Sequence, residues 1–258
     1  MSIYQHFREE ERPFVDQVIE WQGDVTLRHL DRLSDFLDPR QQEIVRSIIG
    51  QDDDVSLSFA GGSRYAERCR LYMTPPYLET SDDDFKLTLF SIEYPMKFVT
   101  LEHRDILGSL MNVGVKREKF GDIFISDDGV AQVVVASEIA DYVEMNIHTI
   151  GRASVRLNRI PLSEHIIPKD EWEESVITVS SMRLDVVIAQ MYKLSRSKVT
   201  PFIEKGLAKV NWKTVDRVDF LLQEGDYISV KGFGRSRVFA IEGLTKKEKF
   251  RLRFGRKR

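Results

Sequence analysis

Positive and negative charges lie in different parts of this chain of 258 residues. Residues 183–258 hold 19 Lys and Arg against 8 Asp and Glu, a net charge of +11. Residues 1–182 hold the remaining 19 basic and 33 acidic residues, a net charge of −14, so the whole-chain value of −3 hides the contrast. We therefore expect more than one domain, and we expect the basic end to attract polyanions.

Length and composition narrow the class of protein further. A content of 42% hydrophobic and 31% charged residues is typical of a globular protein, and the length allows two or three domains. No stretch approaches the roughly 18 uninterrupted apolar residues of a membrane span, and the acidic N-terminus does not resemble a secretory signal. We expect a cytoplasmic protein, or one of the plastid stroma if the source is a plant. The single cysteine, Cys69, excludes an intramolecular disulfide or a cysteine-based zinc cluster within one chain.

Residues 1–76 form the first predicted domain, a small α+β region that begins with helices. Apolar residues recur at helical spacing over 14–21 and 44–49, Pro39 suits a first helical turn, and Gly50 is a stop signal. The pattern predicts helices throughout the first fifty residues. Short extended segments are expected at Val55–Phe59 and Arg70–Thr74, before a boundary at Pro75 and Pro76.

Residues 77–168 form the second predicted domain, with the order strand, helix, strand, strand, helix, strand. This order matches the split ferredoxin-like (RRM-like) pattern that many RNA-recognition domains share, although the fold alone decides no function. Phe124 is a candidate for base stacking, but a core position is the more frequent role for such a residue. The predicted strands are Phe85–Glu93, Asp122–Ser126, Gly129–Ala136 and Ala153–Ile160, and the predicted helices are Leu101–Val113 and Ser137–Ile147, with a hairpin turn at Asp127-Asp128-Gly129.

Residues 180–258 form the third predicted domain, after a polar linker that contains Pro168 and residues 171–174. Ser181 and Ser195 are suited to cap two short helices, Arg183–Tyr192 and a second that ends at Gly206. Basic and apolar residues alternate over 249–254, which predicts a half-buried strand with a cationic face. The remaining predicted strands are Leu207–Asn211, Tyr227–Lys231 and Arg237–Glu242.

Five short motifs of this third domain resemble the S-four RNA-binding domain, the αL motif of small-subunit ribosomal protein four. They are Arg183-Leu184-Asp185, Leu194-Ser195-Arg196-Ser197-Lys198, Lys209-Val210-Asn211, Gly225-Asp226-Tyr227-Ile228-Ser229-Val230 and Gly232-Phe233-Gly234-Arg235. The resemblance implies that two helices and the following strand loop dock on structured RNA. We predict RNA contacts at Arg183, Ser195, Arg196, Ser197, Lys198, Lys205, Lys209, Asn211, Lys213, Lys231, Arg235 and Arg237.

Trp212 is a departure from that resemblance, because the family often has glycine after the asparagine. We expect that the turn is not of the simple Asn-Gly type, and that Trp212 packs against the domain rather than stacking on a base.

The middle of the chain is similar to the YlmH family. The similarity rests on residues 101–114, Lys116-Arg117 and Gly121-Asp122-Ile123, with Gly61-Gly62 and Ala66-Glu67-Arg68 also in place. It implies binding to ribosomal RNA of the large ribosomal subunit and to tRNA, in the handling of stalled large subunits, and a link to cell division. A second RNA contact is open at Arg104, Lys116, Arg117, Lys119, Arg152 and Arg156, which are equally well explained as ordinary surface cations.

Two other functions stay open from the sequence. Pseudouridine synthases carry an Arg-Leu-Asp context that Asp185 reproduces, but here it opens a helix of the binding domain, and residues 1–180 show no catalytic domain. An adaptor would instead bind a protein through the acidic N-terminal half. The five histidines, at positions 6, 29, 103, 148 and 165, show no metal-ligand spacing. We expect a monomer without catalytic residues, metal or cofactor.

Overall fold

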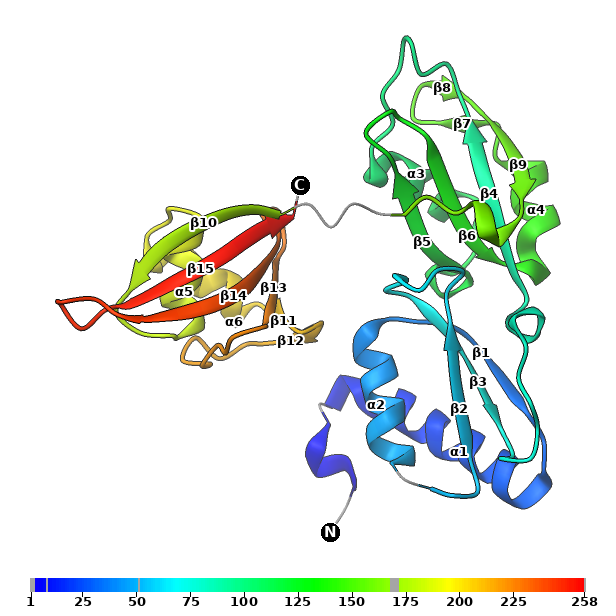
Figure 1. Ribbon diagram of the computed structural model, residues 1–258, viewed down its shortest axis with the longest axis horizontal. Coiled ribbons are helices and arrows are strands. Elements are labelled where there is room, and N and C mark those ends of the chain that lie inside the picture. Colours follow the sequence, from blue (N-terminus) through cyan, green and yellow to red (C-terminus); the bar gives the residue numbers. More distant parts are fainter. Residues whose placement is uncertain (1–2, 8, 51, 168–171, 258) are drawn as a thin grey trace. The chain divides into compact units, whose positions relative to one another are not determined.

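The computed structural model describes residues 3–7, 9–50, 52–167 and 172–257 (Figure 1). The chain forms two compact units, Met1–Lys169 and Asp170–Arg258. Both units mix helices and strands, which confirms the expected α+β class. None of the helices in the described ranges is long and apolar enough to cross a membrane.

The first half of the N-terminal unit is a three-stranded antiparallel sheet with two helices. The sheet has the order β1-β3-β2. Pro39 opens α2 and Gly50 ends it at a φ of 58°, as the sequence predicts. Asp38 caps the helix in a capping box with Gln41, which the sequence analysis did not predict. The elements are η1 (Ile3–His6), η2 (Glu9–Glu11), α1 (Arg12–Arg28), β1 (Arg32–Leu37), α2 (Pro39–Ile49), β2 (Ser56–Ala60) and β3 (Cys69–Thr74).

Strand β1 shows that the expectation of helices throughout the first fifty residues was wrong. Ser34 and Asp35 are adjacent polar residues, and they interrupt the alternation of apolar and polar residues that would predict a strand. Pairing decides its conformation: β1 runs antiparallel to β3, and the Leu71 amide donates to the Ser34 hydroxyl at 2.9 Å. Phe36 of this strand is fully buried. A contact partner 37 residues away in sequence therefore overrides the local pattern.

The second half of the N-terminal unit confirms the ferredoxin-like order. Its four main strands pair antiparallel in the order β5-β6-β4-β9, and Gly129 takes a φ of 86° in the expected hairpin turn. Ser137 was expected to cap a helix but begins a 3-10 turn, and a short β7–β8 hairpin was missed. The elements are η3 (Asp82–Phe85), β4 (Leu87–Glu93), α3 (His103–Asn112), η4 (Arg117–Lys119), β5 (Phe120–Ile125), β6 (Ala131–Ala136), η5 (Ser137–Ile139), α4 (Ala140–Asn146), β7 (Thr149–Ile150), β8 (Ala153–Ser154), β9 (Arg156–Ile160) and η6 (Leu162–Glu164).

Both faces of this four-stranded sheet are covered. One face packs against α3 and α4 through Phe90 and Val133. On the other face Phe124, which is 5% exposed, packs in a cluster with Phe36 of β1. Gly121 leaves room for the Phe36 ring, because a Cβ at position 121 would lie 2.8 Å from Phe36 Cε1. Phe124 is therefore a core residue, and the sheet face that stacks bases in other RNA-recognition domains is closed here.

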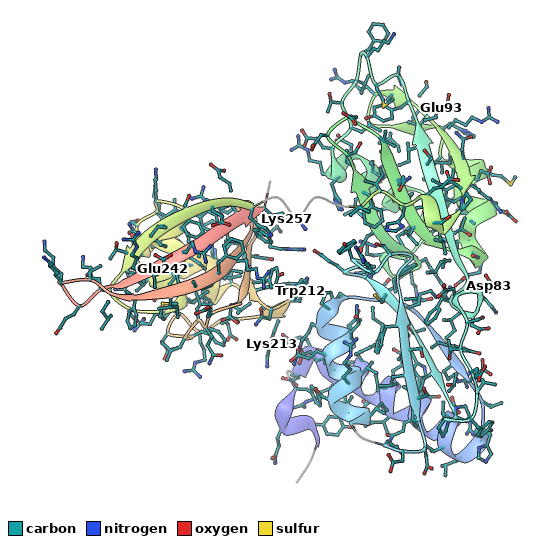
Figure 2. All side chains as sticks on the ribbon, in the orientation of Figure 1. Asp83, Glu93, Trp212, Lys213, Glu242 and Lys257 are labelled. Atoms are coloured by element: carbon teal, nitrogen blue, oxygen red, sulfur yellow. The ribbon has the colours of Figure 1, made fainter. Side chains whose placement is uncertain are left out.

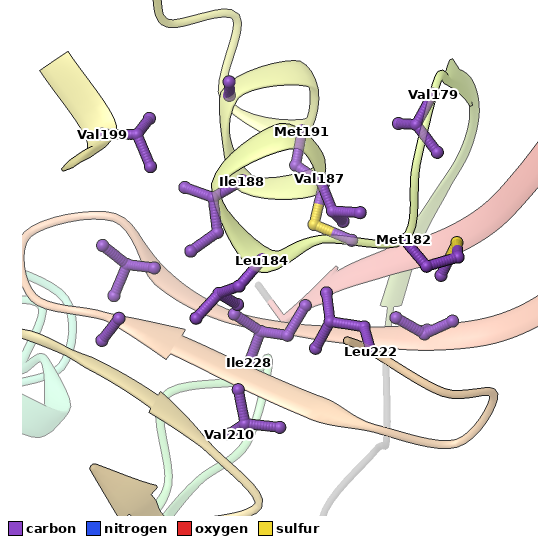
Figure 3. Packing of buried hydrophobic residues seen from close by; sticks show 14 of the residues in the cluster. Val179, Met182, Leu184, Val187, Ile188, Met191, Val199, Val210, Leu222 and Ile228 are labelled. Carbon is purple, nitrogen blue, oxygen red and sulfur yellow. The ribbon is translucent and has the colours of Figure 1, made fainter. Parts of the chain in front are cut away.

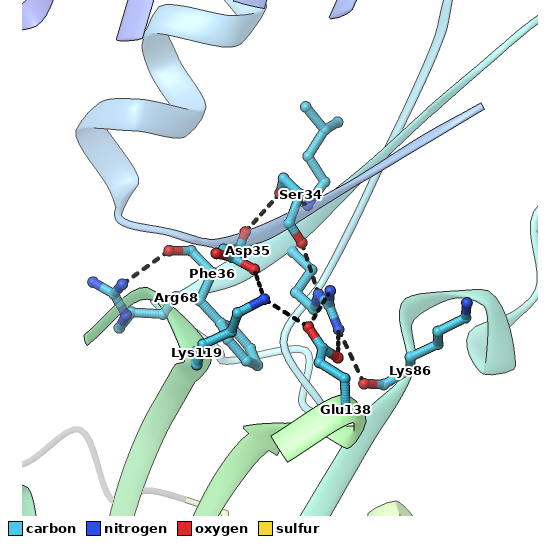
Figure 4. A network of polar contacts seen from close by, with 9 residues as sticks. Ser34, Asp35, Phe36, Arg68, Lys86, Lys119 and Glu138 are labelled. Carbon is cyan, nitrogen blue, oxygen red and sulfur yellow. Dashed lines mark hydrogen bonds and ion pairs between the residues drawn. The ribbon is translucent and has the colours of Figure 1, made fainter. Parts of the chain in front are cut away.

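A network of polar contacts that includes Ser34, Asp35, Lys119 and Glu138 joins the two halves of the N-terminal unit (Figure 4). Arg70 on β3 is 3% exposed; its Nε donates to the Ser34 carbonyl at 2.7 Å and its Nη1 to Glu138 Oε2 at 3.0 Å. Lys119 Nζ bridges Asp35 at 2.5 Å and Glu138 at 2.9 Å. Since every charge has a partner, the network fixes the halves against each other without an isolated buried ion.

The C-terminal unit is a six-stranded antiparallel sheet with α5 and α6 on one face (Figure 1). Leu184, Val187 and Ile188 of α5 and Ile203 of α6 pack on Ile228 of the sheet (Figure 3). On the other face of the sheet, no helix is found among the described residues 172–257. The elements are β10 (Trp172–Val179), α5 (Leu184–Met191), α6 (Arg196–Glu204), β11 (Ala208–Val210), β12 (Lys213–Thr214), β13 (Tyr227–Val230), β14 (Gly234–Leu244) and β15 (Phe250–Lys257).

Strand β10 corrects the prediction of a polar linker at residues 171–174. Trp172, Glu173 and Glu174 are its first residues, and the strand pairs with β15 along its full length. β10 lies at the edge of the sheet. Only Val179 among its residues is buried, and a strand with one buried position does not need the run of apolar residues by which a core strand is predicted. Pro168 and Glu171 lie outside the described residues. Leu252 and Phe254 of β15 face the core and Arg251 is exposed, which confirms the cationic strand predicted there.

Candidate nucleic-acid interface

A buried carboxylate holds two arginines at the start of the helix pair. Asp185, in the first turn of α5, is 2% exposed. Its Oδ1 accepts a hydrogen bond from Arg183 Nε at 3.1 Å, and its Oδ2 accepts two from Arg196, at 3.0 Å from Nε and 2.5 Å from Nη2. The arginine side chains are 37% and 59% exposed. Asp185 therefore presents two oriented guanidinium groups to solvent.

The electrostatics of Asp185 agree with this positioning role. Burial raises the pKa of the Asp185 carboxyl, but the hydrogen bonds and charges of Arg183 and Arg196 outweigh it, and the net pKa is lowered. Because guanidinium groups occupy both of its oxygens, Asp185 does not present a free carboxylate to a substrate. This geometry argues against the role that the Arg-Leu-Asp context suggests in pseudouridine synthases.

The first turn of α6 adds exposed polar and basic groups beside Arg196. Ser195 occupies the N-cap position, but its hydroxyl makes no capping bond and lies 3.0 Å from the Ser197 hydroxyl, which corrects the predicted cap. Lys198 is exposed and has no ion pair with a described residue. Lys205 is at the opposite end of α6, about 13 Å further along the helix axis.

The loop between β13 and β14 joins this side of the unit through Phe233. The Phe233 ring lies 5.0 Å from that of Tyr192 and 5.5 Å from that of Phe202, so the loop packs on both helices. Lys231, next to Gly232 in this loop, is exposed. We call the combined region the helix-pair surface; it consists of Arg183, Ser195, Arg196, Ser197, Lys198, Lys205 and Lys231.

The β11–β12 turn differs from its predicted form. Asn211 and Trp212 take φ values of 48° and 64°, so the hairpin has the two left-handed central residues of a type I′ turn, with tryptophan in the place that suits glycine. The Asn211 side chain donates to Asp226 at 2.8 Å and accepts from the Tyr227 amide at 2.9 Å. Asn211 therefore supports the turn, and Lys213 follows at the start of β12.

Three of the predicted contacts lie away from the helix-pair surface. Lys209 pairs with Ser229, which in turn pairs with Arg235, and Tyr227 pairs with Arg237. Their neighbours along the strands, such as Ile228 and Val230, point into the core. Lys209, Arg235 and Arg237 are thus on the sheet face opposite the helices, which we call the open sheet face.

Three of the candidate contacts in the middle of the chain, Arg104, Arg117 and Lys119, have partners within the unit. The Arg117 guanidinium donates to the carbonyls of Phe120 and Gly121, and burial, with the nearby charge of Arg68, lowers its pKa to about 10. Lys119 belongs to the Glu138 network. Arg104 is exposed and pairs with Glu102 at 2.9 Å, and the other three candidates, Lys116, Arg152 and Arg156, are exposed.

Three of the motifs that carry the YlmH resemblance, Gly61-Gly62, Ala66-Glu67-Arg68 and Gly121-Asp122-Ile123, lie where the two halves of the N-terminal unit meet. Asp122 accepts from the Glu67 amide at 2.7 Å, and Arg68 donates to the carbonyls of Phe36 and Phe120 at 2.9 and 3.1 Å. A Cβ at Gly61 would lie 2.3 Å from the Arg68 carbonyl oxygen, so the turn requires glycine. Within the described ranges, no group of three or more His, Cys, Asp or Glu side chains could hold a metal ion.

Comparisons with known proteins agree with this arrangement. Three family models match the chain: "YlmH, N-terminal" at residues 10–78, "Putative RNA-binding domain in YlmH" at 80–164, and "S4 domain", the S-four type, at 182–228. The chain is 45% identical over 257 residues to the "Ribosome-associated protein quality control protein P2" of Bacillus subtilis (strain 168), covering 100% of this chain and 99% of that protein. The chain belongs to the YlmH family.

A solved structure of the YlmH family supports the same conclusion. The "Cell division protein ylmH from Streptococcus pneumoniae" is 32% identical, with a TM-score of 0.54, and it covers 64% of this chain and 100% of that chain. The S4 match ends at residue 228. It therefore includes α5, α6 and the Trp212 turn, but strands β10, β14 and β15 lie outside it.

The sequence reasoning missed several residues of the open sheet face. The signal was the spacing of Arg235, Arg237 and Phe239 at every second position of β14, which places basic and aromatic side chains on one face of the strand. The missed residues are Trp172, Tyr227, Phe239 and Lys257.

Proposed function

We propose that this YlmH-family protein is a non-catalytic RNA-binding protein that docks on structured ribosomal RNA of the large ribosomal subunit, with tRNA as a second ligand, in the cytoplasm or the plastid stroma. The observation that carries the proposal is the pair of exposed arginines held by the buried Asp185 within the segment that matches the S4 domain. The name of the Bacillus subtilis relative supports an association with ribosomes.

The cations of the helix-pair surface are available to bind phosphates. Arg183 and Arg196 are held in place before RNA arrives, so little side-chain entropy is lost on binding. Lys198, Lys205 and Lys231 are exposed and have no ion pair with a described residue, so they can neutralise phosphates without breaking an internal contact. A rigid cationic surface of this kind suits recognition of RNA shape rather than of base sequence.

The test replaces the three lysines of the helix-pair surface by glutamate in the full-length protein: Lys198→Glu, Lys205→Glu and Lys231→Glu. Binding to purified large subunits, measured by co-sedimentation, and to a fluorescent RNA hairpin, measured by anisotropy, should fall steeply. If all three contact phosphates, the slope of log affinity against log salt should decrease by about 2 to 3.

A matched control comes from the β14–β15 turn, which forms the far tip of the sheet (Figure 1). Lys246→Glu, Lys247→Glu and Lys249→Glu change the net charge by the same amount on exposed residues remote from the helices. We expect much weaker effects from this control. Equal losses in the two triple variants would show that only net charge matters, and the helix-pair surface would lose its assigned role.

The adaptor hypothesis is compatible with this proposal. The excess of acidic residues in residues 1–182 supports a protein partner there, and the name of the Streptococcus pneumoniae relative suggests cell division as the setting.

A further inference from the structure

Trp212 takes a backbone conformation that its side chain disfavours. Its φ of 64° is in the left-handed region, at the position of a type I′ turn where glycine is preferred because it has no side chain. Such strain persists where the surrounding contacts hold the residue, and it is a reason to ask what the side chain does. The Trp212 ring is half-buried and lies 5.1 Å from the ring of Tyr227 on the open sheet face.

The rings of the open sheet face form a continuous row. Trp212 contacts Tyr227, Tyr227 lies 6.0 Å from Trp172, and Trp172 lies 5.9 Å from Phe239. All four residues are half-buried. A Cβ at Gly255 would lie 2.6 Å from Phe239 Cε2 and 2.7 Å from Trp172 Cβ, so both side chains lie directly against the β15 backbone. The row is therefore firmly supported by the sheet beneath it.

Cations lie over these rings. Arg237 Cζ is 4.9 Å from the centroid of Tyr227 and 5.7 Å from that of Phe239, and Arg235 Cζ is 5.5 Å from that of Trp212. Lys257 Nζ lies 6.0 Å from the centroid of Trp172. Arg237 makes no ion pair with a described residue. Trp212, Lys213 and Lys257 gather at one end of the unit (Figure 2).

Alternating aromatic rings and planar cations are the chemistry of a single-stranded nucleic-acid site. Unpaired bases stack on aromatic rings or on guanidinium planes, while the neighbouring cations hold the phosphates. A base-paired helix cannot use such a surface, because its bases are already stacked on each other. An acidic peptide would use the cations but gain little from a row of four rings.

We propose that the open sheet face binds an unpaired RNA segment by stacking its bases on Trp212 and Tyr227 and holding its phosphates near Arg235 and Arg237. The inference rests on the proposed RNA-binding function and adds a second site with a different ligand: structured RNA on the helix-pair surface and unpaired nucleotides on the opposite face. The two surfaces are independent, because the sheet and its core separate them.

Trp212→Gly in the full-length protein is the sharpest test. It removes one stacking ring and converts the turn to Asn-Gly, for which both left-handed residues are favourable, so folding should not suffer. We expect affinity for an unstructured RNA of about ten nucleotides to fall about tenfold, with unchanged affinity for an RNA hairpin. Tyr227→Leu, which keeps an apolar side chain on the sheet, should have the same selectivity.

Three further measurements make the result decisive. The helix-pair lysine variant should lose hairpin binding and keep much of its binding to the unstructured RNA. Arg251→Gln is a matched control, because Arg251 shares this face but pairs with Glu242 at 2.8 Å, and it should have little effect. Tryptophan fluorescence should be quenched by the unstructured RNA, and less so in Trp212→Gly.

The outcomes separate the two claims. If the wild-type protein binds the hairpin and Trp212→Gly and Tyr227→Leu both bind the unstructured RNA as the wild type does, the stacking site is wrong and the proposed function stands. A competition experiment compares polyglutamate with a second unstructured RNA of equal charge. If both displace the bound RNA equally effectively, the face recognises anions or acidic peptides, and base stacking is refuted. If the wild type binds neither RNA, the proposed function itself fails.

Discussion

Asp185→Asn tests whether a buried carboxylate organises the RNA-binding surface. The substitution keeps the shape of the side chain but removes its negative charge. It also replaces one of the two oxygens that accept bonds from Arg183 and Arg196 by an NH2 group, which donates. Hydrogen bonds to charged groups contribute about 1.5–3 kcal/mol each, and breaking a fully buried pair costs about 3–5 kcal/mol. Both arginine side chains are partly exposed and can be rehydrated, so we expect a loss of about 1–3 kcal/mol in the C-terminal unit.

The assay is thermal unfolding at neutral and acidic pH. For a domain of this size, the loss lowers the midpoint by roughly 4–8 °C per kcal/mol. The pKa of Asp185 is lowered in the folded protein, so its stabilisation is present above its unfolded pKa of about 3.9 and is lost as the pH falls through the lower folded value. The difference between wild type and Asp185→Asn should therefore shrink below about pH 4.

RNA binding gives the more telling result, because two effects have opposite signs. The substitution removes one negative charge, which by itself strengthens binding to RNA. Loss of the oriented guanidinium groups weakens it, and we expect the weakening to dominate. Asp219→Asn is the matched control, since it makes the same charge change at a surface pair with Arg217, at 3.2 Å. Equal or tighter RNA binding by folded Asp185→Asn would refute the positioning role.

Two further predictions concern the N-terminal unit. Phe36→Ala should cost about 3–5 kcal/mol, because Phe36 is fully buried against Phe124 and closes the sheet face. Hydrogen exchange of the backbone amides of β1 and β3 measures it, and a change below about 1 kcal/mol would contradict that packing. Burial raises the pKa of the Cys69 thiol to about 11, so alkylation of the folded protein at pH 8 should be roughly a hundredfold slower than that of free cysteine, and mass spectrometry showing an equal rate would contradict the burial.

Local patterns were sufficient for the elements whose stabilising contacts are close in sequence. The helices α2, α5 and α6 follow from the spacing of their apolar residues, and the hairpin at Gly129 follows from its turn residues, all within a few positions of one another. Strands β1 and β10 could not be found in this way. Their conformation comes from pairing with β3 and β15, which are distant in sequence, and their own residues show no alternation.

The candidate site divides in the same way. The sequence by itself determined that the C-terminal third is a basic RNA-binding type of domain, because its charge excess and its motifs are properties of the residues alone. Only the tertiary structure decided how those cations are used. Asp185 brings together two arginines that are 13 positions apart in sequence. The alternation of side chains along β13 and β14 places Arg235 and Arg237 on the sheet face opposite α6. Arg117 is partly buried and donates to a backbone carbonyl within the fold. Those roles depend on which atoms meet in space, and spacing along the chain does not contain that information.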